Sequence, residues 1–193
     1  MAFISLQEII EILIMTVAIG FIFSRFFPRK PKEDYDPLTY FNKSPLNNLW
    51  EDIKHGAIIA APAVVLHELA HKVVAMSFGA TATLHAPLTM YAIVIILILI
   101  RFPIIFFVGG YVSHTALPAF QSSLVSVAGP LTNIILWAVF FFISKQHIGK
   151  KYRKEMMMMA KINLFLAAFN MIPFPGFDGF NFFRALLIGF GIL

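Results

Sequence analysis

The stretch GAIIAAPAVVLHELAHKVVAMSF, residues 56–78, is apolar, long enough to cross a bilayer, and contains the motif HELAH at residues 67–71. On a helix, His67 and His71 are four residues apart and project from one face. Two imidazoles placed in this way can take adjacent corners of a tetrahedral zinc site, with Glu68 beside the open corner as a base for water. Because ionisable groups inside an apolar segment are costly, they indicate a functional site. The motif therefore predicts zinc-dependent hydrolysis within a membrane.

The overall composition is typical of a membrane protein. Of 193 residues, 59% are hydrophobic and the mean hydropathy is +0.81, whereas a water-soluble globule has an apolar share of roughly 45–50%. The net charge is +5, but the basic residues lie between apolar segments, where membrane proteins place Lys and Arg near lipid headgroups. This distribution predicts a lipid bilayer as partner and no nucleic acid. Since the chain has no cysteine, a metal must be held by His, Asp or Glu.

The apolar segments define the expected architecture. They cover about residues 3–27, 56–78, 88–108, 121–144 and 156–172, with a short one at 180–193. A spanning helix needs about 20 residues. We therefore predict an all-α polytopic membrane protein, a multi-pass integral protein of the cell membrane with a bundle of about five to six membrane segments. A single domain is expected over 1–193, with its core at 56–187, an extra N-terminal transmembrane helix at 1–27 and a polar loop at 28–55.

Segment 88–108 has two interpretations. It is either one helix with a snorkelling arginine or a re-entrant hairpin that turns at Arg101–Pro103. The loops 24–54 and 145–154 carry most of the basic residues, and if both lie on one face, an even number of crossings separates them. Segments 56–78 and 121–144 supply two crossings, so 88–108 would enter and return. We therefore favour a small β or re-entrant element between the second and third core helices.

A third metal ligand is expected from another helix. Three of the four aspartates, Asp34, Asp36 and Asp52, lie in the polar loop, and only Asp178 is embedded in apolar sequence. It lies in NMIPFPGFDG, residues 170–179, whose prolines and glycines interrupt the preceding helix. A broken helix in a membrane is tolerated where its freed backbone groups face a polar cavity or packed protein. The competing interpretation, Asp178 as a helix cap, is less favoured in the presence of the HELAH motif.

With these elements the chain resembles the site-2 protease family of intramembrane zinc metalloproteases. HELAH matches the family's HExxH, residues 170–179 match its Asn-x-x-Pro…Asp-Gly element, and Gly129-Pro130-Leu131-Thr132-Asn133 resembles its Gly-Pro-x-x-Asn span. The sequence GGYV at 109–112 is similar to the glycine-containing edge strand that often follows the first motif. The likeness covers roughly residues 56–187. It departs at FDGF, residues 177–180, where many members have Leu-Asp-Gly-Gly, and in the long apolar segment 88–108.

The resemblance implies specific roles for five residues. His67, His71 and Asp178 would bind one zinc ion per chain, Glu68 would be the catalytic base, and Asn170 would help hold the substrate or stabilise the oxyanion. It also implies a membrane orientation opposite to that given by the charge bias, which places the two basic loops in the cytoplasm.

The expected activity is that of a zinc metalloendopeptidase that cuts transmembrane or membrane-anchored protein substrates. Two alternatives remain, a transporter or ion-conducting protein that uses the His and Asp cluster, and a catalytically silent membrane scaffold. Three further polar or small residues receive structural interpretations. Gly129 and Asn133, four apart on a helix, are expected to serve close packing and interhelical hydrogen bonding, and Lys72 is expected to snorkel or to face a polar channel.

Overall fold

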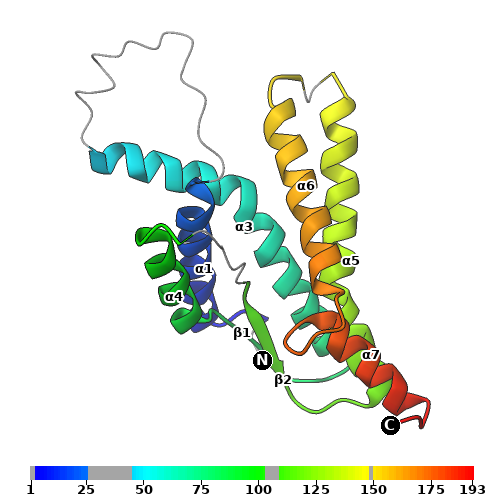
Figure 1. The fold of residues 1–193 in the computed structure, drawn as a ribbon. Helices are drawn as coiled ribbons and strands as arrows, with labels where there is room; N and C mark the ends of the chain where they lie inside the picture. The colour runs from blue at the N-terminus through cyan, green and yellow to red at the C-terminus, as the bar shows by residue number, and fades with distance from the viewer. Residues whose placement is uncertain (1–2, 26–44, 103–108, 148–149) are drawn as a thin grey trace.

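The computed structural model describes residues 3–25, 45–102, 109–147 and 150–193. Helix α3 lies between two groups of elements, with α1 and α4 on one side and α5 and α6 on the other (Figure 1). The short helix α7 packs against α5, and two strands form an antiparallel pair. The elements are α1 (Leu6–Ser24), α3 (Pro45–Ser77), β1 (Ala82–His85), α4 (Leu88–Leu99), β2 (Tyr111–His114), α5 (Ala119–Lys145), α6 (Arg153–Asn170) and α7 (Asp178–Gly189).

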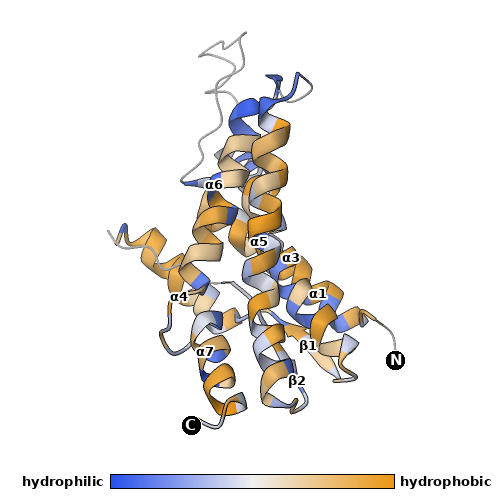
Figure 2. Ribbon diagram, turned by 90° about the vertical axis from the view of Figure 1, so that its right-hand side faces the viewer, coloured by the Kyte–Doolittle hydropathy of each residue, from blue (hydrophilic) through white to orange (hydrophobic). Residues whose placement is uncertain are grey.

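Within the part of the chain that the structure describes, three helices are long and apolar enough to cross a membrane, namely Leu6–Ser24, Leu49–Ser77 and Ala119–Lys145. Hydrophobic residues cover most of α4 and α5, while hydrophilic residues gather at the turn between α5 and α6 (Figure 2). Helices α4 and α7 have 12 residues each and are therefore roughly 18 Å long, too short for a hydrocarbon core of about 30 Å. Three helices among the described residues are thus suited to span a membrane, which is consistent with a membrane protein. This number is smaller than the five to six segments predicted from the sequence.

Helix α3 begins earlier than its apolar sequence suggests. It starts at Pro45, so residues 45–55 are helical and the predicted polar loop 28–55 is correspondingly shorter. Proline is favoured at the first helical position, where its missing N–H removes no intrahelical bond. The apolar residues 46, 49, 50 and 53 follow at the spacing of one helical face. The helix period therefore continues through residues whose average polarity suggested a loop.

Helices α1 and α3 cross closely at two glycines. A Cβ atom at Gly20 would lie 2.6 Å from the carbonyl oxygen of Ile53, and one at Gly56 would lie 2.8 Å from the backbone nitrogen of Ser24. Small residues at a helix crossing allow the two backbones to approach and gain dispersion contacts. Met15 and Ile19, both fully buried, continue this contact along α1. The N-terminal helix is thus packed into the core.

The segment between the two strands leaves the sheet and returns to it. His85 at the end of β1 pairs with Tyr111 at the start of β2, so both ends of the intervening chain lie together. Helix α4 occupies the first part of this segment, and Arg101 just after it has φ 57°. This arrangement supports the re-entrant interpretation of 88–108, although residues 103–108, with part of the expected turn, lie outside the described residues.

The segments that flank the two basic loops lie in positions that agree with a re-entrant segment 88–108. The C-terminal end of α1, the start of α3 and the α5–α6 turn lie at one end of the molecule, and the strands lie toward the other (Figure 1). An even number of crossings between the two basic loops, on which the parity argument depends, fits this arrangement.

Lys72 is buried and paired, so the expectation that it snorkels or faces a polar channel is wrong. Its side chain is 2% exposed and forms an ion pair with Glu8 of α1. The Glu8 carboxylate also accepts hydrogen bonds from the backbone N–H groups of Leu84 at 2.9 Å and Ser5 at 2.8 Å. Lys72 can be buried because the Glu8 carboxylate, which is itself held by backbone N–H donors, balances its charge.

Carboxylates of α1 also cover one edge of the small sheet. Thr115 N–H donates to the carbonyl of Thr81, so the N–H groups of Leu84 and Ala86 point away from β2. Glu8 accepts from Leu84, and Glu11 accepts from Ala86. Strand β1 is therefore closed on the side of α1, and β2 provides the other edge of the pair.

The buried ion pair leads to a prediction about stability. Glu8→Gln and Lys72→Met should each lower the free energy of unfolding in detergent by about 3–5 kcal/mol, because each leaves one buried charge without its partner. The double variant should recover most of this loss, since it buries neither charge. Chemical unfolding in mixed micelles measures all three variants.

The exposed pair of Lys54 and Glu51, whose side chains are 48% and 51% exposed, provides the matched control. Lys54→Met should change stability by about 0–1 kcal/mol. A double Glu8/Lys72 variant no more stable than the worse single variant would contradict the pairing.

Candidate metal centre

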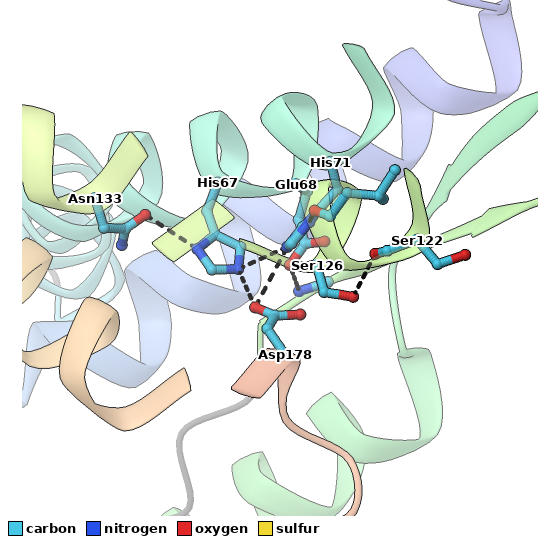
Figure 3. Close-up of polar contacts among 9 residues, drawn as sticks. His67, Glu68, His71, Ser122, Ser126, Asn133 and Asp178 are labelled. Atoms are coloured by element: carbon cyan, nitrogen blue, oxygen red, sulfur yellow. Dashed lines mark hydrogen bonds and ion pairs between the residues drawn. The ribbon is translucent and has the colours of Figure 1, made fainter. Parts of the chain in front are cut away.

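Helix α3 turns two imidazoles toward the same point. His67 and His71 are 5% and 7% exposed, and their Nε2 atoms lie 3.1 Å apart. Their rings are in an edge-to-face arrangement with centroids 4.7 Å apart. This is the arrangement expected for residues four apart on a helix. In Figure 3 both rings point toward the carboxylate of Asp178.

Asp178 completes a group of three potential ligands. Its Oδ2 atom lies 2.9 Å from Nε2 of His67 and 3.3 Å from Nε2 of His71. In a tetrahedral zinc site with bonds of about 2.0–2.1 Å, neighbouring ligand atoms are roughly 3.3 Å apart. The spacing and the nitrogen and oxygen donors therefore fit a zinc ion. Among the described residues, this is the one cluster of three or more His, Cys, Asp or Glu side chains suited to a metal.

The break between α6 and α7 brings Asp178 to the histidines. Helix α6 ends at Asn170, and Gly176, with φ 99°, takes the left-handed conformation that allows the chain to turn back. Gly179 lets the start of α7 lie against the backbone of Met171, which a Cβ atom would overlap. Phe177 occupies the N-cap position, and Asp178 is the first residue of α7. The helix interruption predicted from the prolines and glycines is therefore present. The Asp178 carboxylate contacts the two histidines, whereas the competing interpretation made it a helix cap.

Helix α5 orients both histidine rings. Nδ1 of His67 lies 3.0 Å from Oδ1 of Asn133, and Nδ1 of His71 lies 2.7 Å from the carbonyl oxygen of Val125. Both partners are acceptors, so with a metal bound each Nδ1 would donate its proton to α5 and each Nε2 would present its lone pair to the metal. Partners of this kind fix the tautomer of a metal-binding histidine. The interhelical hydrogen bond expected for Asn133 is present, and its partner is a candidate ligand.

Gly129 of α5 leaves space for the centre. A Cβ atom at this position would overlap Nε2 of both His67 and His71. The close packing expected for Gly129 is therefore directed at the ring atoms that face Asp178. Any larger residue would collide with the two ring nitrogens that are candidate metal ligands.

Glu68 lies beside the cluster but is outside it. It is 5% exposed, and its Oε1 atom accepts a hydrogen bond from the Gly110 N–H at 3.1 Å. It lines a cavity of about 260 Å³ formed by α3, β2, α5, α6 and the start of α7, and Asn170 lines the same cavity. The structure thus brings together all five residues proposed from the sequence. His114 and Ser126 also line the cavity, and the sequence assigns neither of them to the site.

A comparison with known proteins supports the metal assignment. The chain is 33% identical over 178 residues to the "Putative zinc metalloprotease MJ0611" of Methanocaldococcus jannaschii. The aligned region covers 91% of this chain and 82% of that protein. The chain belongs to this zinc metalloprotease family. No protein-family model matches the sequence, and no solved structure is similar to it.

The orienting role of Asn133 can be tested in this zinc metalloprotease. Asn133→Ala should weaken zinc binding by about 10- to 100-fold, because the His67 ring loses the acceptor that fixes its tautomer. Competition with a chromophoric chelator measures the affinity.

Asn163 provides the control, because it is also a buried asparagine and its side chain donates to the carbonyl of Met159 within α6. Asn163→Ala should reduce stability without changing zinc affinity. Equal zinc affinities for the two variants would exclude an orienting role.

A second prediction concerns the space at Gly129. Gly129→Ala should remove zinc from the purified metalloprotease, since the new methyl group overlaps the two Nε2 atoms. Gly189→Ala is the control, because a Cβ there meets ring carbons of Phe120 at 3.1 Å or more, away from the centre. Metal analysis should find zinc in the control alone, and full zinc content in Gly129→Ala would show that the centre lies elsewhere.

Proposed function

We propose that this protein is an intramembrane zinc metalloendopeptidase of the site-2 protease type, which hydrolyses peptide bonds within or near transmembrane segments. The observation that carries the proposal is the position of the cluster. His67, Glu68 and His71 lie within an apolar helix long enough to span a membrane, and Asp178 faces them across the cavity. One zinc ion per chain would be held by Nε2 of His67, Nε2 of His71 and a carboxylate oxygen of Asp178.

The residues around the cavity supply the remaining chemistry. When bound, zinc would polarise the scissile carbonyl and lower the pKa of a water molecule. Glu68 takes the proton of the attacking water and delivers it to the leaving amine. Asn170, at the cavity wall, holds the substrate or donates to the developing oxyanion. The hydrogen bond from Gly110 to Glu68 holds the base beside the histidines.

The proposed substrates are transmembrane or membrane-anchored proteins, and they bind in extended form. The amides of a helix are hydrogen-bonded to one another, so the segment to be cut must unwind and find new partners. The second edge of β2 can provide them by strand addition, and residues 109–112 line the cavity. Because the carboxylates of α1 occupy the outer edge of β1, addition is directed to β2.

The location follows from the same features. We propose a multi-pass protein of the cell membrane, spanned by α1, α3 and α5, with lipid around their exposed apolar side chains and no nucleic acid as partner. A transporter or ion-conducting protein is not favoured, because the side chains of His67, His71 and Asp178 form one compact cluster. A silent scaffold is not favoured either, since the candidate ligands His67, His71 and Asp178 and the candidate base Glu68 all line one cavity.

Glu68→Gln tests the mechanism directly. This change keeps the size of the side chain and a hydrogen-bond acceptor for Gly110 but removes the base. Cleavage of a transmembrane peptide in liposomes should therefore fall by about 10²- to 10⁴-fold, with the zinc content unchanged. Glu155→Gln, at the start of α6, is the control and should cleave at the wild-type rate. Cleavage by Glu68→Gln within a few-fold of wild type would contradict the proposed mechanism, whatever the metal content.

A further inference from the structure

A single peptide unit connects the candidate base to a tyrosine on α4. The hydroxyl of Tyr91 donates a hydrogen bond to the carbonyl oxygen of Gly109 at 2.9 Å. The N–H of Gly110 donates to Oε1 of Glu68 at 3.1 Å. The carbonyl and the N–H belong to the same peptide bond, and in a trans peptide they point in opposite directions. Tyr91 therefore holds one end of the unit whose other end holds Glu68.

This peptide unit needs such an anchor because the two residues that it joins, Gly109 and Gly110, are both glycines. Glycine has access to both signs of φ, so a peptide between Gly109 and Gly110 can rotate with little steric resistance. Rotation would turn the N–H away from Glu68 and present a carbonyl oxygen to a carboxylate. The hydrogen bond from Tyr91 favours the orientation in which the N–H faces the base.

The surroundings make the contact a tight one. Tyr91 is 3% exposed and lies on the face of α4 that also buries Val94 and Ile98. A Cβ atom at Gly110 would lie 2.9 Å from Cγ of Glu68 and 2.9 Å from Cε of Met15. Glycine at 110 is thus required for the backbone to approach Glu68, and the same requirement leaves the peptide free to rotate. A buried tyrosine hydroxyl also needs a partner, and Gly109 supplies it.

We propose that Tyr91 is a positioning residue for catalysis, which acts on Glu68 through the peptide unit between Gly109 and Gly110. The expected effect on kcat rests on the proposed function. The hydrogen bonds from Tyr91 to Gly109 and from Gly110 to Glu68 do not depend on it. With Oε1 held by Gly110, Oε2 is the oxygen of Glu68 that exchanges the proton with water and with the leaving amine. The re-entrant segment that contains α4 would then serve the chemistry as well as the architecture.

Tyr91→Phe removes the hydroxyl and keeps the ring. We expect kcat for a transmembrane peptide to fall by about 10- to 100-fold, as misplacement of a catalytic group by a distant change allows, with KM and zinc content unchanged. Hydrogen–deuterium exchange of the Gly110 amide, followed by mass spectrometry on overlapping peptides that begin at least three residues before Gly110, should become roughly five- to tenfold faster. An unchanged exchange rate, or a kcat within twofold of wild type, would overturn the proposal.

Two controls separate this effect from a general loss of packing. Val94→Ala removes buried apolar contacts from the same face of α4 and should lower the thermal stability while kcat and Gly110 exchange stay near wild type. Tyr152→Phe alters a tyrosine that is 51% exposed and should change none of the measurements. If Val94→Ala reduced kcat as much as Tyr91→Phe, the hydroxyl would have no specific role and the proposal would fall.

The exchange measurement also distinguishes this proposal from the proposed function. If wild-type protein cut no transmembrane peptide, the protease assignment would fail. Faster exchange at Gly110 in Tyr91→Phe would still support the connection from Tyr91 to Glu68, and unchanged exchange would overturn it.

Discussion

The need to pair ionisable groups inside an apolar helix determines most of this structure. Helix α3 carries four such side chains in six residues, His67, Glu68, His71 and Lys72, and all four are at most 7% exposed. In an apolar environment an unpaired polar or charged group costs several kcal/mol. Each group therefore has a partner inside the protein, and the partners come from four different parts of the chain. The partners are Asn133 and Val125 of α5, Asp178 of α7, Gly110 before β2 and Glu8 of α1.

This distribution makes the N-terminal helix part of the site. Helix α1 lies outside the likeness to the site-2 protease family, which covers roughly 56–187, yet Glu8 neutralises the lysine next to His71 and closes an edge of β1. The close crossing at Gly20 and Gly56 holds the other end of α1 on α3. The helix thus supports the candidate metal centre and leaves β2 as the edge that we propose for substrate pairing.

The sequence predicts the cluster of His67, His71 and Asp178, because the cluster depends on side-chain type and spacing. His67 and His71 were found from their separation on a helix, and Asp178 from its position in an apolar segment with prolines and glycines. The partners that act through their backbone, Val125 and Gly110, leave no such signal, because any residue has a carbonyl and almost any has an N–H. The pairing of Lys72 leaves no local signal either, since its partner lies 64 residues away. The helical period at the start of α3 is hidden by the polar average of residues 45–55.

The glycines explain how backbone groups can enter the site at all. At residues 110 and 129 a Cβ atom would overlap Glu68 or the two histidine rings, so both positions must be small for α5 and the chain before β2 to reach α3. Because glycine has no Cβ atom, however, the backbone dihedral angles at these two positions are less restricted by steric contacts. At Gly129 the surrounding helix restores that control, because its dihedral angles are fixed by intrahelical hydrogen bonds. Gly110 lies outside a helix and needs a separate constraint, and the hydrogen bond from the Tyr91 hydroxyl to the Gly109 carbonyl provides one.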